Sequence, residues 1–250
     1  MGVVRDWRER GRDLDVKVVP AGSIYDQHVT AADDAAEEAI RDSLQRADPS
    51  TPVVADVAGA DIERYRFWVI DPIDGTTNFI GGSSFVAVSV SLVVDGVPRV
   101  AAAGCPFTGE VFSAAEALGA FRQPGERLRL TERPRSEREV VIDPETPPVA
   151  QRALWEDVRR RIAGVSGGVV ARASIALSMA YVAAGRFDGF VQLGGSPLQD
   201  FAAGTLLIHE AGGTASGLDG DVPWRSEVVI AGTPQTYDDL RAVLARDAER

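Results

Sequence analysis

Two aspartates, Asp71 and Asp74, carry the most distinctive chemistry in the sequence. They follow the apolar run Phe67–Ile70, which we interpret as a short buried strand, and Pro72 between them should take the chain out of regular strand pairing. Two carboxylates would then emerge together at a strand end. Hard divalent cations such as Mg²⁺ prefer oxygen ligands and leave positions for water and phosphate. The pair could therefore bridge two ions, with the carbonyl oxygen of Ile73 as a further ligand.

The residues that follow suit a phosphate. Gly75 would let the backbone approach a ligand closely, and a helix beginning at Thr76 or Thr77 would direct free N–H groups towards an anion. Asp-Pro and Asp-Gly are also ordinary turn dipeptides, so either aspartate alone would be read as a turn or cap residue. The complete heptapeptide from Asp71 to Thr77, placed directly after a strand, is what favours a metal and phosphate site.

Other polar residues have structural explanations when each is taken alone. Thr30 and Asp33 have the spacing of a capping box, and Asp200 stands where the N-cap of an apolar helix belongs. We interpret the lone His28 and His209 as structural or exposed. Cys105 is expected to be a small buried residue.

The elements that must position these residues alternate between helix and strand. The expected helices run from Thr30 with Ala36, Ile40 and Leu44 on one face, over Ala150–Ile162, over Ser174–Ala184, from Asp200 through Ile208, and over a final segment capped by Thr236 and Asp239. The expected strands are Phe67–Ile70, a hairpin of Phe85–Val94 with a strand from Val97, Val111–Ala114, the Leu128 region and Phe190–Leu193. This irregular α/β mixture predicts layered mixed sheets and helices, an α+β fold, and neither a barrel nor a Rossmann sheet.

Composition limits the function classes. The chain has 250 residues, of which 45% are hydrophobic, and it carries 26 Lys and Arg against 37 Asp and Glu. The net charge of −11 argues against a nucleic-acid partner. A single cysteine and the lack of a signal-like or membrane-spanning run favour a soluble, cytoplasmic protein with small-molecule partners and no membrane contact. We expect one unit over residues 1–250, with sub-lobes of about 1–130 and 149–250 on either side of the polar stretch Thr131–Pro148.

The stretch from Trp68 to Phe79 resembles the signature of the inositol monophosphatase family of metal-dependent sugar and cyclitol phosphatases. Three further segments resemble family motifs in the family's order, so that the likeness runs from about Val29 to Leu240: Val29–Asp33, Ala180–Gly189, and Asp200–Gly204 through Glu210–Gly213. The resemblance implies a layered αβαβα sandwich of the inositol monophosphatase and fructose-bisphosphatase type. It also implies a homodimer.

The resemblance further implies roles for individual residues. Carboxylates of Asp71, Asp74 and Asp200 and the carbonyl of Ile73 would bind two or three Mg²⁺ ions per site. Thr76 together with Asp33 would position and deprotonate the attacking water. Backbone amides of Gly75 and Thr76, with Thr77 beside them, would hold the phosphate of a small phosphate monoester.

The sequence departs from the family pattern in two places. A Gly-Glu-Glu segment usually precedes the heptapeptide and supplies a metal ligand, whereas this chain has Val54-Ala55-Asp56-Val57, so Asp56 is the expected substitute. In the family, a Trp usually precedes the aspartate that corresponds to Asp200, but this chain has Gln199 there. Gln192 falls near the place where some members have a carboxylate that contacts substrate hydroxyls. These changes leave the substrate open.

Several alternatives therefore stay open. A histidinol-phosphate phosphatase, a fructose-bisphosphatase and a nucleotide phosphatase share related scaffolds. The loss of two glutamates at Asp56-Val57 also suits a degenerate member that binds a phosphorylated ligand or a partner without turnover. Other chemistries lack support, because the sequence has no Gly-x-x-x-x-Gly-Lys loop, Gly-x-Ser-x-Gly elbow or His-Glu-x-x-His segment.

Overall fold

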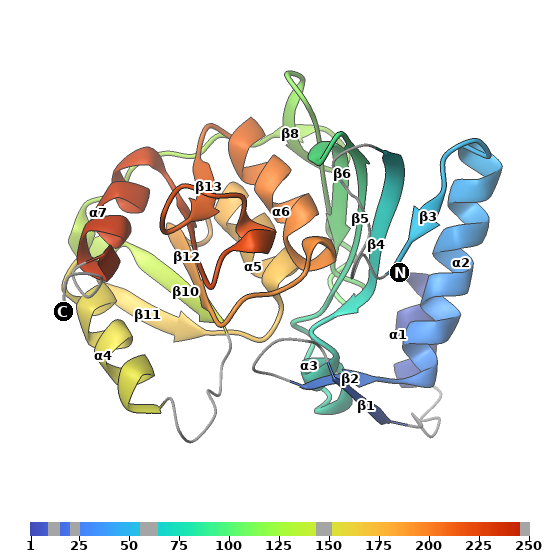
Figure 1. Ribbon diagram of the computed structural model, residues 1–250, viewed down its shortest axis with the longest axis horizontal. Helices are drawn as coiled ribbons and strands as arrows, with labels where there is room; N and C mark the ends of the chain where they lie inside the picture. The colour runs from blue at the N-terminus through green and yellow to red at the C-terminus, as the bar shows by residue number, and fades with distance from the viewer. Residues whose placement is uncertain (10–15, 21–25, 56–64, 144–151, 246–250) are drawn as a thin grey trace.

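The computed structural model describes residues 1–9, 16–20, 26–55, 65–143 and 152–245. Two large sheets stand side by side with a pair of helices between them, and further helices cover the outer face of each sheet (Figure 1). Layers therefore follow in the order helix, sheet, helix, sheet, helix. The predicted αβαβα sandwich is confirmed.

The first sheet contains strands from the N-terminal half in sequence order. They are β3 (Val53–Val54), β4 (Arg66–Asp74), β5 (Ala87–Val94), β6 (Val97–Gly104), β7 (Val111–Ala115), β8 (Gly119–Arg122) and β9 (Glu126–Arg127). Neighbours are antiparallel except β3 and β4, which are parallel. The predicted hairpin is confirmed: Asp95 and Gly96, with φ of 51° and 73°, form its two-residue turn. The strand predicted around Leu128 ends one residue earlier, at Arg127.

The second sheet has the order β11-β10-β12-β14-β13. Its strands are β10 (Glu139–Asp143), β11 (Gly168–Ala171), β12 (Gly189–Leu193), β13 (Thr214–Gly217) and β14 (Val228–Gly232). β10 runs parallel to both β11 and β12, whereas β14 is antiparallel to its two neighbours. Because β10 lies within the polar stretch 131–148, the chain enters the second sheet inside the expected boundary. The division into two sub-lobes stays a prediction.

Seven α-helices occur among the described residues. α1 (Gly2–Glu9) and α2 (Ala31–Ala47) cover the first sheet, α4 (Arg152–Ala163) and α7 (Pro234–Leu244) cover the second, α5 (Ile175–Ala183) and α6 (Leu198–Glu210) lie between the sheets, and α3 (Thr76–Ile80) follows β4 (Figure 1). A separate two-stranded sheet pairs β1 (Lys17–Pro20) antiparallel with β2 (Asp26–Val29), and short 3-10 turns span Arg135–Glu137 and Pro223–Arg225. Within the described ranges, no helix is both long and apolar enough to cross a membrane.

α5 and α6 are apolar on nearly all sides because each faces a sheet as well as the other helix. Their contact is close: a Cβ on Gly204 of α6 would lie 2.4 Å from the Cβ of Met179 of α5. Glycine therefore sets the distance between the two central helices. Both sheets pack on this shared layer, so it joins the two halves of the chain.

Two predicted helix starts are wrong. α6 begins at Leu198 after Pro197, so Asp200 lies in the first turn and is not the N-cap. Thr233 caps α7 by accepting a hydrogen bond from the Thr236 amide, and neither Thr236 nor Asp239 is the N-cap. Each helix starts earlier than its polar residues suggested because a proline at or just before its first residue already has the φ that a helix needs.

Candidate active site

The end of β4 forms one wall of the site. Asp71 pairs with Ser89 of β5 and Asp74 with Ala87, so the two residues between them in β4 lie opposite a single residue of β5. The amide of Ile73 donates to Asp71 Oδ1 at 3.1 Å within this irregular segment. The expected break in pairing at Pro72 is therefore confirmed, although the strand assignment itself continues through Asp74.

Gly75 joins β4 to α3 in a conformation that requires glycine. Its φ is +89°, and a Cβ there would lie 2.6 Å from the carbonyl oxygen of Ala173. α3 begins at Thr76, as predicted, and the amide of Phe79 donates to the Gly75 carbonyl at 2.9 Å. The corner that carries the predicted phosphate contacts Gly75, Thr76 and Thr77 therefore presses directly on the segment before α5.

Asp33 and Thr76 meet although they lie 43 positions apart in the sequence. Thr76 Oγ1 is 3.4 Å from Asp33 Oδ1 and 2.9 Å from the carbonyl oxygen of Ile73, within hydrogen-bonding distance of both. Asp33 Oδ2 accepts from the amide and the hydroxyl of Thr30, at 2.8 and 2.6 Å. The capping box is therefore real, and it leaves the other oxygen of Asp33 facing Thr76.

Asp74 is buried and points at the N-terminus of α5. Its Oδ1 accepts from the amide of Ile175 at 3.0 Å, and its Oδ2 accepts from the amide of Ala176 at 2.9 Å and from the hydroxyl of Ser174. The residue predicted as a metal ligand thus also holds a helix of the central layer.

Burial raises the pKa values of the site carboxylates, and neighbouring negative charges raise those of Asp71 and Asp200 further. Burial is the main reason that the pKa of Asp71 lies well above its usual range, and the negative charges of Asp74, Asp200 and Asp33 raise it further. Burial raises the pKa of Asp74 to about 6 against the hydrogen bonds from α5. Burial and the charge of Asp74 raise the pKa of Asp200 to about 8, opposed by a hydrogen bond from Ser196. No positive charge is among the main causes of these pKa shifts. The structure therefore gathers four acidic groups without a positive charge of that kind to compensate them.

The two glutamines named from the sequence lie near Asp200. Gln192 of β12 is buried, and its Nε2 donates to the carbonyl of Gly195 at 3.0 Å and to Ser196 Oγ at 3.4 Å. Gln199 precedes Asp200 in α6. The Oε1 atoms of Gln192 and Gln199 are both buried without a hydrogen-bond partner among the described residues.

Comparison with known proteins adds to this geometry. Residues 2–250 match the model of the inositol monophosphatase family. The chain belongs to this family. It is 34% identical over 226 residues to the inositol-1-monophosphatase of Rhizobium meliloti (strain 1021), covering 88% of this chain and 83% of that protein. It is also 34% identical over 222 residues to the Nus factor SuhB of Escherichia coli (strain K12), covering 87% and 81%.

A solved structure agrees with the family assignment. The crystal structure of the extragenic suppressor protein SuhB from Bartonella henselae superposes with a TM-score of 0.82 at 30% identity, covering 98% of this chain and 93% of that chain. The resemblance inferred from the motifs is therefore confirmed. Membership of the inositol monophosphatase family supports a phosphatase of that type.

The donor chemistry of the site fits the metal ions that this family generally uses. Asp71, Asp200 and Asp33 are only half-buried, and their crowded negative charge would be relieved by a hard divalent cation. Within the described ranges, however, no three His, Cys, Asp or Glu side chains converge on one point that could hold an ion. Asp74 is turned towards α5, and Asp56 lies outside the described residues. The ligand set as a whole stays a prediction.

Sequence reasoning missed the two serines that contact the aspartates. The sequence predicts Ser174 only as the start of a helix and indicates no role for Ser196. Its partner Asp200 lies four residues further on, so a Ser-x-x-x-Asp spacing was the only local signal. By contrast, two structural interpretations are confirmed: His209 Nε2 accepts from the amide of Ala215 at 3.2 Å, and Cys105 is buried.

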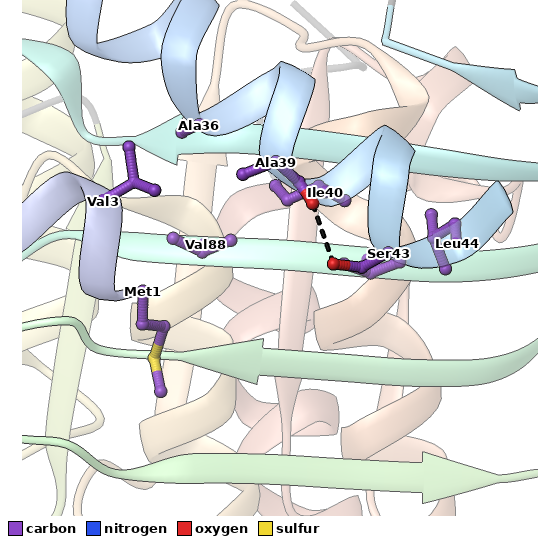
Figure 2. A pocket seen from close by; sticks show the side chains of 9 residues that line it. Met1, Val3, Ala36, Ala39, Ile40, Ser43, Leu44 and Val88 are labelled. Atoms are coloured by element: carbon purple, nitrogen blue, oxygen red, sulfur yellow. Dashed lines mark hydrogen bonds between the residues drawn. The ribbon is translucent and has the colours of Figure 1, made fainter. Parts of the chain in front are cut away.

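A cavity of about 300 Å³ lies elsewhere, between α1, α2 and β5. Figure 2 shows its apolar lining, in which the one polar side chain drawn, Ser43, donates to the carbonyl of Ala39. None of the predicted site residues lines it. This cavity therefore takes no part in the site at the end of β4.

Proposed function

We propose that the protein is a Mg²⁺-dependent phosphatase that hydrolyses a small phosphate monoester, of the cyclitol or sugar class. The observation that carries this proposal is the gathering of Asp33, Asp71, Asp74 and Asp200, from three separate elements, around the end of β4. Crowding four half-buried or buried carboxylates together is costly unless a cation compensates their charge. Family membership supports the same reaction type.

Asp71, Asp74, Asp200 and the carbonyl of Ile73 would hold the ions, with Asp56 as the further ligand named from the sequence. Bound Mg²⁺ would supply a lowered pKa for the attacking water and charge stabilisation at the phosphate and the leaving oxygen. The number of ions, two or three, is part of the proposal. So are the homodimer and the cytoplasmic location.

Asp33 and Thr76 would handle the proton of the water. Thr76 can donate its hydroxyl proton to Asp33 Oδ1 while a lone pair of Thr76 Oγ1 accepts from a water. Burial raises the pKa of Asp33, against the hydrogen bonds from Thr30, which makes its carboxylate a better base. The second oxygen of Asp33 is held by Thr30, so the base is fixed to the start of α2.

The remaining residues would bind substrate. Gly75, Thr76 and Thr77 lie at the start of α3, where backbone amides would contact the phosphate. Gln192 and Gln199 each carry a buried oxygen that has no partner in the described part of the chain, and a hydroxyl of the leaving alcohol would satisfy it. A site of this kind favours a polyhydroxylated alcohol over an apolar one.

The test is phosphate release from a panel of cyclitol, sugar, histidinol and nucleotide monophosphates, with and without Mg²⁺. We expect turnover that depends on Mg²⁺ and is lost in Asp33→Asn. Asp34→Asn is the matched control, because Asp34 is the exposed neighbour on the same helix turn. The absence of turnover for every ester at all Mg²⁺ concentrations would refute the enzymatic proposal.

One observation favours a second candidate, a member that binds without turnover. The chain is as similar to the Escherichia coli relative named Nus factor SuhB as to the Rhizobium meliloti inositol-1-monophosphatase, at 34% identity in each case. Asp56-Val57 in place of two glutamates agrees with weaker metal binding. The same panel separates the candidates, because a binding-only member would release no phosphate from any ester.

A further inference from the structure

Both carboxylate oxygens of Asp74 accept hydrogen bonds from residues at the beginning of α5. Oδ1 accepts from the amide of Ile175 at 3.0 Å, and Oδ2 accepts from the amide of Ala176 at 2.9 Å, the amide of Leu177 at 3.4 Å and the hydroxyl of Ser174. All of these bonds are buried, and Asp74 is only 6% exposed. The two partners are separated by about a hundred residues of sequence.

Two neighbours of Asp74 contact the same segment. A Cβ on Gly75 would lie 2.6 Å from the carbonyl oxygen of Ala173, and Asn78 Nδ2 donates to that oxygen at 3.1 Å and to the carbonyl of Phe85 at 2.8 Å. The corner after β4 therefore fits against residues 173–177 at three points. This contact joins the first sheet to the helix layer that both sheets share.

Ser174 has an unusual role for the residue at a helix N-cap. An N-cap serine ordinarily accepts from an amide of its own helix, but α5 has no such side-chain bond. The hydroxyl donates to Asp74, and the carboxylate of Asp74 accepts the α5 amides in its place. The N-terminal end of a helix also favours a negative charge. The cap of α5 is thus supplied by a residue of β4.

We propose that Ser174 is a positioning residue for the metal-binding carboxylate of Asp74. With the α5 amides, its hydroxyl fixes the rotation of the carboxylate before any ion binds, so less ordering is needed when Mg²⁺ arrives. Partners of this kind orient metal ligands and typically affect metal affinity by about 10–100-fold. The inference rests on the proposed function, because it requires that Asp74 bind Mg²⁺.

The experiment compares three variants by titration calorimetry with Mg²⁺ alone, without substrate. Ser174→Ala removes the hydroxyl, and Ser174→Thr keeps it. Ser178→Ala is the matched control: Ser178 lies one turn further along α5, is fully buried, and its hydroxyl has no hydrogen-bond partner among the described residues. Thermal unfolding without metal shows whether each variant folds and how much stability it loses.

We expect Ser174→Ala to weaken Mg²⁺ binding about tenfold or more, and we expect Ser174→Thr to bind Mg²⁺ close to the wild-type affinity. Ser178→Ala should bind Mg²⁺ as the wild type does, even if it melts at a lower temperature. Unchanged Mg²⁺ affinity in Ser174→Ala, or an equal loss in Ser174→Thr, would overturn the positioning role alone. A wild-type protein that binds no Mg²⁺ would overturn the proposed function and this inference with it.

Discussion

At the scale of single residues, Asp71 and Asp74 differ in what holds them. Asp74 accepts hydrogen bonds from Ser174 and the α5 amides, whereas the hydrogen bond found at the Asp71 side chain comes from the Ile73 amide of its own segment. Both are proposed metal ligands, so both matter for catalysis. Only Asp74 also stabilises the contact between β4 and α5.

The substitutions Asp71→Asn and Asp74→Asn should separate these tasks. Both should lower kcat/KM by at least about a hundredfold, because each removes charge that holds the metal. In metal-free protein, Asp74→Asn should also lower the melting temperature, because an amide NH₂ cannot accept from the α5 amides. Asp71→Asn should keep or raise it, since it removes repulsion with Asp74 and Asp200. Equal melting temperatures for the two variants would contradict this account of Asp74.

The contacts of these residues show which parts of the site can be predicted from the sequence and which cannot. The motif from Asp71 to Thr77 could be found because its residues are consecutive, and the contact of Thr76 with Asp33 followed from the family resemblance. The bond between Asp74 and Ser174 could not be found, because it spans two elements about a hundred residues apart. A serine before an Ala-rich helix predicts a local cap, and nothing local indicates that another strand supplies it.

At the scale of elements, the start of α2 shows that capping and chemistry are compatible. Asp33 Oδ2 completes the capping box with Thr30, and Oδ1 faces Thr76. The spacing of Thr30 and Asp33 was therefore sufficient to predict the helix start. It could not tell whether Asp33 has a second role, because a capping box uses only one of the two carboxylate oxygens.

The start of α7 was predicted wrongly because Asp239, one of the polar residues taken as its cap, binds a segment outside the helix. Asp239 accepts from Arg138 at 2.6 Å and from Arg135 at 3.0 Å, and both arginines lie in the segment that leads into β10. Arg138 is only 5% exposed, and its buried charge is compensated by Asp239 at 2.6 Å and by the more distant Glu132 at 3.7 Å. Asp239 therefore fixes the passage between the two sheets to α7.

This pair predicts a loss of stability in acid. The hydrogen bond from Arg135, then Arg138, holds the pKa of Asp239 below its usual value of 3.8. A depressed carboxyl pKa stabilises the fold above the unfolded pKa, and that stability is lost as the pH falls through the folded value. Asp239→Asn should lower the free energy of unfolding by about 3 kcal/mol at neutral pH, because it leaves Arg138 buried without its full partner.

Denaturant unfolding at neutral pH and in acid checks this prediction. The difference between the wild type and Asp239→Asn should shrink as the pH falls below the usual pKa of 3.8. Asp238→Asn is the control, because its side chain is exposed on the same helix. A difference between wild type and Asp239→Asn that stays constant over this pH range would show that the ion pair is not its source.

At the scale of the whole molecule, the shared layer of α5 and α6 should couple the unfolding of the two halves of the chain. Sequence patterns identified both helices, because their apolar residues continue for a full helix length. They could not show that each helix packs against two sheets, since an apolar helix is buried in many architectures. In this arrangement, neither sheet can lose its inner helix layer without exposing the core of the other. The predicted single unit of 250 residues should therefore unfold as one.

The substitution Gly204→Ala tests this coupling. Its Cβ would lie 2.4 Å from the Cβ of Met179, so α5 and α6 must move apart, at a cost of about 1–3 kcal/mol. Hydrogen exchange followed during heating should show β5 and β12 losing protection together, at a lower temperature than in the wild type. Gly2→Ala, where a Cβ meets nothing within 4 Å, should leave that temperature unchanged. Earlier loss of protection in β12 alone would mean that the sub-lobes unfold separately and that the central helices do not couple them.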